Sequence, residues 1–244
     1  MCDEEVPKVS MSTIIKEFSR FAQQYEQYNM IQTEVAKRLV EKLPNTCYDS
    51  ILDIGSGTGQ VYQNLQKYSI DHHSFTAFDS SSNMLSLHPR ANNIKTVCAD
   101  FNDTAFTDLL DKRYDLILSS SALQWSSDLD FTLKSLSALS PRLHAAIFTS
   151  GTFKTLHKTA NVDSPIYTDK ALRECILKYY ESANFALHTY VLEFDSVRDM
   201  FAYIKKSGVS SGEKKLSYKE TKALMKSYPL KYLEFEVLFV EAMR

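Results

Sequence analysis

Apolar residues in the first part of the chain follow a helical spacing. Five of them lie at alternating steps of four and three residues: Ile14, Phe18, Phe21, Tyr25 and Tyr28. Side chains at these steps share one face of a helix, so the pattern predicts a helix over residues 13–28. A similar stripe predicts a second helix over residues 31–43, which ends before Pro44.

Short apolar runs dominate the next hundred residues. They lie at residues 50–54, 74–78, 95–99, 114–118 and 145–149. Segments of helical length separate them, a pattern typical of βαβ units and a parallel sheet. Ligands bind such sheets at the carboxyl ends of the strands.

The pattern changes after residue 150. Two further strands are predicted over residues 187–194 and 232–240, and two helices over residues 197–204 and 217–227. We therefore expect an α/β fold. Its core would be a doubly wound, Rossmann-like, mostly parallel sheet of seven strands, with N-terminal helices and a small helical insertion.

Composition narrows the class of protein. The chain has 244 residues, 24% of them charged, a net charge of −2 and four scattered cysteines. This length suits one domain, and the lack of a basic excess disfavours nucleic acid as a partner. No cysteine pair has zinc-ligand spacing, and no apolar run is long enough for a membrane span. We expect a cytoplasmic monomer without a metal site or a membrane partner.

A cluster of glycines indicates where a ligand would bind. Three of the six glycines, Gly55, Gly57 and Gly59, follow the first apolar run, where a strand turns into a helix. Gln60 rules out both the phosphate loop and the dinucleotide fingerprint, which need lysine or glycine there. Asp53 would repel a pyrophosphate but suits a cationic ligand.

Acidic residues also end the next two predicted strands, at Asp79 and Asp100. A carboxylate at such a strand end can accept the hydroxyls of a ribose. Together with residues 51–59, ILDIGSGTG, this arrangement resembles the first motifs of class I methyltransferases. The resemblance implies S-adenosylmethionine as cofactor. The residues expected to bind it are Asp53, Gly55, Ser56, Gly57, Gly59, Asp79, Ser80, Met84, Asp100, Phe101 and Ser119.

The resemblance extends to the malonyl-[acyl-carrier protein] O-methyltransferases of biotin synthesis. It is carried by Phe18, Ala22 and Tyr25, by YDLILSSSALQW (114–125), by GTFKTLH (151–157) and by the tail PLKYLEFEVL (229–238). One departure is PRLH at 141–144, where many relatives have Pro-Gly-Gly.

The implied reaction transfers a methyl group to the free carboxylate of a malonyl thioester. The implied partner is the malonyl-acyl-carrier protein, or malonyl-coenzyme A. A carboxylate has a pKa of roughly 4, so no general base is needed. The residues that we expect to border the reacting groups are Tyr25, Gln124 and Trp125, although Tyr25 and Trp125 could instead be core aromatics.

A cation should pair with the malonyl carboxylate, and the sequence does not choose among Arg20, Arg142, Arg173 and Arg198. An acidic carrier could dock on lysines of the later half: Lys154, Lys158, Lys178, Lys205, Lys206, Lys214 and Lys215. Lys154 and His157 could instead face the thioester arm or simply be solvated.

The resemblance also implies a division of the single domain (1–244). We expect a helical lid (1–45), a cofactor-binding core (46–150), a mainly helical substrate region with one strand (151–228) and a final strand (229–244). Two alternatives remain open. The enzyme could methylate a free small acid similar to aconitate, or the chain could bind S-adenosylmethionine without catalysis.

Overall fold

A computed structural model of the protein describes residues 29–111, 113–206 and 218–244. The helix predicted over 13–28, with Tyr25 and Arg20, lies outside these residues, as do Lys214 and Lys215. The strands are β1 (Cys47–Ile54), β2 (Asp71–Asp79), β3 (Ile94–Cys98), β4 (Leu116–Ser120), β5 (Arg142–Phe148), β6 (Ser182–Glu193) and β7 (Tyr232–Met243). The α-helices are α3 (Met30–Glu41), α4 (Gln60–Lys67), α5 (Ser82–Leu87), α6 (Leu129–Leu139), α7 (Lys154–Ala160), α8 (Asp169–Tyr179), α9 (Val197–Lys206) and α10 (Tyr218–Ser227).

The strands form one seven-stranded sheet in the order β3-β2-β1-β4-β5-β7-β6. The pairings from β3 through β5 are all parallel. Only β7 runs the other way, antiparallel to both β5 and β6. The predicted doubly wound, mostly parallel sheet is therefore confirmed.

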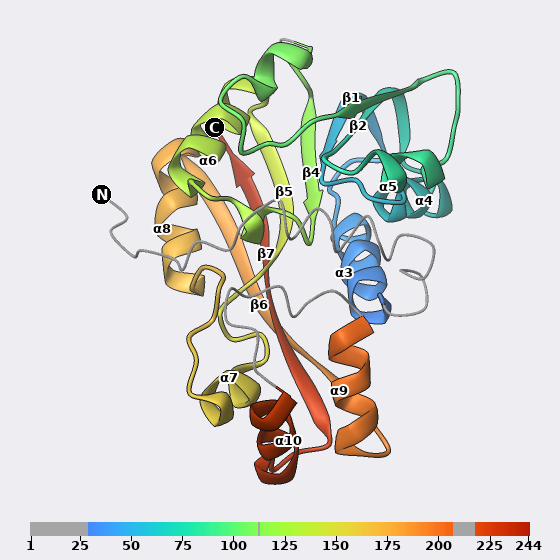
Figure 1. Ribbon diagram of the computed structural model, residues 1–244. Coiled ribbons are helices and arrows are strands. Elements are labelled where there is room, and N and C mark those ends of the chain that lie inside the picture. The colour runs from blue at the N-terminus through green and yellow to red at the C-terminus, as the bar shows by residue number, and fades with distance from the viewer. Residues whose placement is uncertain (1–28, 112, 207–217) are drawn as a thin grey trace.

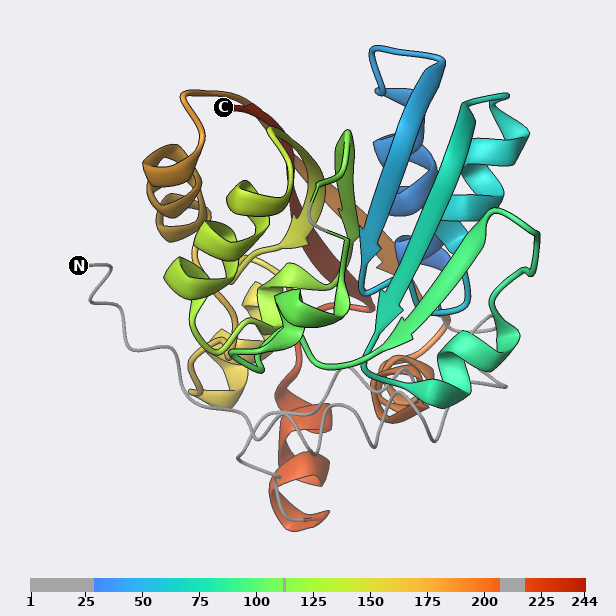
Figure 2. The same cartoon turned by 90° about the horizontal axis from the view of Figure 1, so that it is seen from above.

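Helices cover both faces of this sheet (Figures 1 and 2). Alternation along β1 shows why: Leu52 and Ile54 join one apolar cluster, whereas Ile51 joins another. The first cluster contains residues of α6 and α8, and the second contains residues of α3 and α4. Because successive side chains of a strand point to opposite faces, a strand buried on both sides is apolar at nearly every position.

Several strands extend beyond their predicted bounds. The fifth was predicted to begin at residue 145 but begins at Arg142, and the sixth begins at Ser182 instead of residue 187. Both additions pair with β7, Arg142 and Ser182 each lying opposite Met243. Pairing with a partner strand thus keeps these residues extended where their own pattern gave no signal.

The helices predicted after residue 150 are present as α9 and α10, and the segment predicted over 31–43 is α3. Helix α6 buries its apolar face, which includes Leu129, Leu133 and Leu136. Asp128 caps its first turn by accepting a hydrogen bond from the Phe131 N–H at 2.9 Å. In the described ranges, no helix has the length and apolar character to cross a membrane.

Candidate functional site

A tight bend at residues 55–59 joins β1 to α4 at the carboxyl edge of the sheet. Gly55 has a φ of 73°, and a Cβ there would lie 2.2 Å from the Cβ of Ala122. Gly57 has a φ of 53°, but a Cβ there would meet nothing within 4 Å. Gly55 is therefore required for close packing, whereas Gly57 leaves open space beside the backbone.

Asp79 braces this bend from the end of β2. Its two carboxylate oxygens accept hydrogen bonds from the Gly57 and Ser81 N–H groups, each at 2.8 Å. Burial raises the pKa of Asp79, the two N–H donors oppose that shift, and Asp100 adds to it. Each oxygen retains a lone pair, so the carboxylate can still accept from a ligand hydroxyl.

Asp53 lies at the end of β1, beneath the bend, with none of its surface exposed. Both of its carboxylate oxygens lack a hydrogen-bond partner from the described part of the chain. Burial, with a smaller contribution from Asp79, raises the pKa of Asp53 well above its usual value. An uncompensated buried carboxyl is costly, and a cation or a hydrogen-bond donor close to the bend would offset that cost.

A hollow opens over the bend, which we call the glycine-bend pocket. Its lining residues are Gln32, Ala36, Gly55, Ser56, Gly57, Thr58, Gln60, Val61, Ser120 and Ser121. The hydroxyls of Ser56 and Thr58 are buried there without a partner in the described residues. Polar, unpartnered groups above a buried acid fit the amino-acid end of a cationic ligand such as S-adenosylmethionine.

The other residues predicted to bind the cofactor lie along the same edge. Asp100 follows β3 and accepts with one oxygen from the Asn102 N–H and side-chain amide, both at 2.9 Å. Phe101, beside it, is buried. The order β3-β2-β1 thus brings Asp100, Asp79 and the bend into one row.

Three further predicted residues lie on β4, directly after β2 and on α5. Ser119 is buried and donates to the carbonyl oxygen of Ile54 at 2.9 Å, so its hydroxyl joins β4 to β1, and the next two serines line the pocket instead. Ser80 follows β2, and Met84 is buried in α5, whose first turn is capped by the Ser81 hydroxyl.

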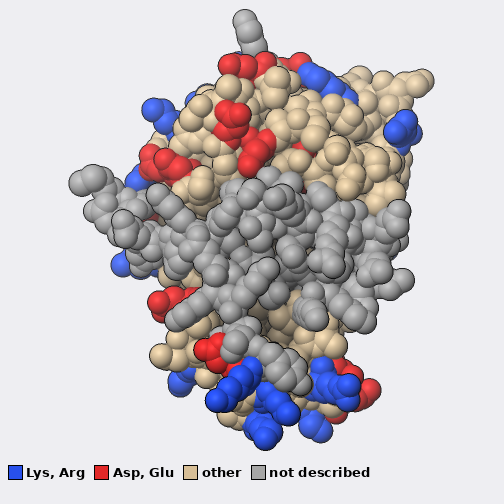
Figure 3. Space-filling model, in the orientation of Figure 1, with Lys and Arg blue, Asp and Glu red and all other residues tan. Residues whose placement is uncertain are grey.

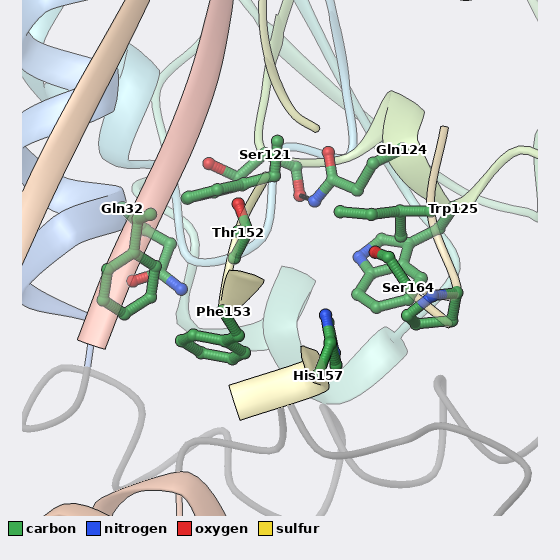
Figure 4. A pocket seen from close by; sticks show the side chains of 12 residues that line it. Gln32, Ser121, Gln124, Trp125, Thr152, Phe153, His157 and Ser164 are labelled. Atoms are coloured by element: carbon green, nitrogen blue, oxygen red, sulfur yellow. Dashed lines mark hydrogen bonds between the residues drawn. The ribbon is translucent and has the colours of Figure 1, made fainter. Parts of the chain in front are cut away.

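A second hollow adjoins the first, and we call it the aromatic pocket (Figure 4). Its lining residues are Gln32, Ser121, Gln124, Trp125, Phe148, Thr152, Phe153, His157, Ser164, Pro165, Ile166 and Phe235. Gln32 and Ser121 line both pockets. The two hollows therefore meet at these side chains, and groups bound in them would face each other.

Gln124 and Trp125 both lie in the wall of the aromatic pocket, on the 3-10 helix Leu123–Trp125. Gln124 donates through Nε2 to the Ser121 carbonyl oxygen at 2.7 Å. Ser121 has a φ of 63°, which is costly for a residue other than glycine. The hydrogen bond holds this turn at the junction of the two pockets.

Sequence reasoning missed Gln32, Ser121 and Ser164, and it left open whether His157 faces the thioester arm or is solvated. In the structure His157 is half-buried in the pocket wall, and burial lowers its pKa, with Asp163 acting in the opposite direction. No local pattern marks these residues, because each occupies a different element. Only the serine-rich end of β4 indicated a ligand-binding residue, and it led to the prediction of Ser119.

Of the arginines proposed to hold a substrate carboxylate, none in the described residues lines either pocket. Arg142 pairs with Asp115 at 2.8 Å, and Arg173 pairs with Asp169 at 2.8 Å. Arg198 is exposed on α9. Among the described residues, no group of three or more His, Cys, Asp or Glu could hold a metal ion.

The sheet order, the glycine bend and the row of acids define a class I, S-adenosylmethionine-dependent methyltransferase. A family model described as "Methyltransferase domain" matches residues 51–141. Among solved structures, the YcgJ protein from Bacillus subtilis shares the fold with a TM-score of 0.64 at 10% identity, covering 86% of this chain and 98% of that one. A putative methyltransferase from Bacillus halodurans gives 0.61 at 11% identity, with 86% and 98% covered.

Curated relatives narrow the family. The chain is 30% identical over 209 residues to the malonyl-[acyl-carrier protein] O-methyltransferase of Pseudescherichia vulneris, covering 83% of this chain and 81% of the relative. It is 30% identical over 158 residues to the enzyme of the same name from Priestia megaterium, covering 61% of this chain and 56% of the relative. The chain belongs to this family of methyltransferases.

Proposed function

We propose that this protein transfers the methyl group of S-adenosylmethionine to the free carboxylate of a malonyl thioester, carried on an acyl carrier protein or on coenzyme A. In biotin synthesis this ester would mask a charge during chain elongation. The observation that carries the proposal is the junction of the two pockets at Gln32 and Ser121. It offers one hollow for a cationic methyl donor and a second, adjoining hollow for an acceptor.

The acceptor hollow suits a nucleophile that is already ionised. A carboxylate with a pKa of roughly 4 needs no base at neutral pH. Within the described residues, His157 is the only Asp, Glu, His, Lys or Arg that lines the aromatic pocket. Its walls combine aromatic and aliphatic side chains with uncharged polar ones, and an enclosed wall with few charges strengthens the attraction between an anion and a cation.

When bound, S-adenosylmethionine would supply an electrophilic methyl group on its sulfonium, with the sulfur as the leaving group. The protein's residues bind and orient. Asp53 would stabilise the positively charged amino-acid end, and Asp79 would accept hydrogen bonds from the ribose hydroxyls. Asp100 would accept a hydrogen bond from the adenine amino group. The Gln124–Ser121 hydrogen bond keeps the junction between the pockets in one geometry.

A labelled-methyl assay tests the proposal. The protein is incubated with S-adenosylmethionine labelled on the methyl group and with malonyl-carrier protein, malonyl-coenzyme A, free malonate or aconitate. We expect a base-labile methyl ester on the thioesters and little label on the free acids. Preferential labelling of a free acid would contradict the substrate assignment, and tight cofactor binding without labelling of any carboxylate would contradict catalysis.

A further inference from the structure

The aromatic pocket contains an unusual number of polar atoms without a partner. Within the described residues these buried, unpartnered atoms are Gln32 Oε1, Ser121 Oγ, Gln124 Oε1, Trp125 Nε1, His157 Nδ1 and Ser164 Oγ. Each such atom costs about 1–3 kcal/mol when it is left unsatisfied. Their convergence on one hollow indicates that a polar ligand group completes the site.

Three of these atoms can donate from one side of the pocket. The indole nitrogen of Trp125 is a donor only, the Ser164 hydroxyl can donate, and His157 donates through Nδ1 in one of its two neutral tautomers. Figure 4 shows these three side chains facing the same hollow. They come from the 3-10 helix after β4, from the segment after α7 and from α7 itself.

We propose that Trp125, Ser164 and His157 bind the acceptor's carboxylate through uncharged hydrogen-bond donors. The inference rests on the proposed function and names the groups that select its substrate. In the described residues no arginine or lysine lines this pocket. Neutral donors of this kind leave the carboxylate its negative charge and its nucleophilicity, and the sulfonium supplies a countercharge.

The state of His157 agrees with this arrangement. Burial lowers the pKa of its imidazole, so the ring is neutral near pH 7 and keeps one N–H. A permanent cation in its place would bind the carboxylate more strongly before the reaction than during it, because the negative charge is lost as the ester forms. Neutral donors avoid this extra stabilisation of the ground state.

Steady-state kinetics with malonyl-coenzyme A tests the inference. Trp125→Phe keeps an aromatic ring but removes the N–H, and Ser164→Ala removes the hydroxyl. We expect each change to raise KM for the malonyl acceptor roughly 5- to 20-fold, while calorimetry gives an unchanged dissociation constant for S-adenosylhomocysteine. Ser164→Thr keeps a hydroxyl and should recover most of the loss.

Ser137→Ala is the matched control. It removes a buried hydroxyl on α6 that donates to the Lys134 carbonyl oxygen, away from both pockets, and should leave KM unchanged. A second readout compares the malonyl thioester with its uncharged amide analogue as a competing ligand. The wild-type protein should prefer the carboxylate, and this preference should shrink in Trp125→Phe and Ser164→Ala.

Two outcomes separate the claims. If wild-type protein methylates malonyl-coenzyme A and both variants keep its KM and its carboxylate preference, the inference is wrong while the proposed function stands. If the wild-type protein methylates no malonyl thioester, the proposed function fails and the inference fails with it.

Discussion

Asp53 shows how a single side chain can favour binding at the expense of stability. Its carboxyl is fully buried and has no partner among the described residues, and burial raises its pKa. A group with a raised pKa in the folded state binds its proton more tightly there than in the unfolded chain. Its contribution to stability is therefore present at low pH and is lost as the pH rises through the folded value.

Asp53→Asn removes this ionisation with little change in volume. We expect the ligand-free variant to be more stable than the wild type by about 1 kcal/mol at pH 8, with a smaller difference at pH 5. Its affinity for S-adenosylhomocysteine should fall at least tenfold, or roughly 1.4 kcal/mol. Thermal unfolding at the two pH values and calorimetry check both effects. A pH-independent loss of stability with full affinity would contradict this role.

Gly55 and Gly57 allow stability and binding to be separated at the same bend. Gly55→Ala combines a left-handed backbone with a Cβ 2.2 Å from that of Ala122, so we expect a loss of roughly 2–4 kcal/mol in unfolding free energy. Gly57→Ala carries only the backbone cost of about 1–2 kcal/mol. Its new methyl group would enter the glycine-bend pocket, so we expect the larger loss of S-adenosylhomocysteine affinity there.

Denaturant unfolding and calorimetry on both variants make the comparison. Equal losses of stability would mean that the contact with Ala122 relaxes freely. Unchanged affinity in Gly57→Ala would mean that the ligand does not approach the bend.

At the scale of elements, His88 couples α5 to α4. It follows the last residue of α5, packs on Tyr62 and Phe75, and lies where a Cβ on Gly59 would be 3.0 Å from its ring. It is buried, and burial lowers its pKa, while the hydrogen bond to the Pro89 carbonyl oxygen opposes the shift. The folded state thus takes up this proton less readily than the unfolded chain.

The consequence is a loss of stability in mild acid. Because the folded pKa lies below the ordinary value near 6.5, the stability due to His88 is complete above that pH and is lost as the pH falls toward the folded value. We expect His88→Phe to flatten the fall in unfolding free energy below about pH 6.5. His144 and His157 have pKa values lowered in the same direction, so part of the slope should remain.

The matched control is His73→Phe, which replaces an exposed imidazole. Urea unfolding across this pH range should give wild-type behaviour for the control. A slope in His88→Phe equal to that of the wild type would show that the proton is taken up elsewhere.

The sequence predicted that a strand is present more reliably than it predicted where the strand begins and ends. The runs at 50–54 and 74–78 are central strands whose apolar faces are buried on both sides, so their signal is local. The first half of β6 alternates between exposed and half-buried residues, and its strand form depends on pairing with β7. Such pairing joins distant segments and leaves little trace in either sequence.

At the scale of the whole molecule, basic residues gather at one end. Figure 3 shows lysine and arginine side chains at the lower end of the view, where Figure 1 places α10. The exposed lysines of this region, which we call the lysine face, are Lys154, Lys158, Lys219, Lys222, Lys226 and Lys231. Helix α10 packs against α7, which contributes His157 to the aromatic pocket.

Lys178 was also a candidate for docking, but it lies on α8 and pairs with Asp130 at 2.9 Å. The side chains of Lys205 and Lys206 lie outside the described set. An acidic carrier protein would find complementary charge on the lysine face, close to the helix that borders the aromatic pocket.

We expect Lys222→Glu combined with Lys226→Glu to raise KM for malonyl-carrier protein roughly 3- to 10-fold while activity on malonyl-coenzyme A changes little. Carrier-dependent kcat/KM should also fall as salt rises from about 0.05 to about 0.3 M, since exposed charges are screened over roughly a Debye length. Lys134→Glu, an exposed position on α6, is the matched control. A flat salt response in the wild type would rule out electrostatic docking.

The sequence by itself determined the succession of the seven strands along the chain, the glycine bend and the acids at the ends of three neighbouring strands. These are local properties: apolar periodicity, glycine at positive φ and a polar residue at each strand end. The tertiary structure alone decided which side chains meet in the aromatic pocket. Gln32, Trp125 and Ser164 are far apart in the chain, and their unpartnered atoms become visible only once packing has removed water from them.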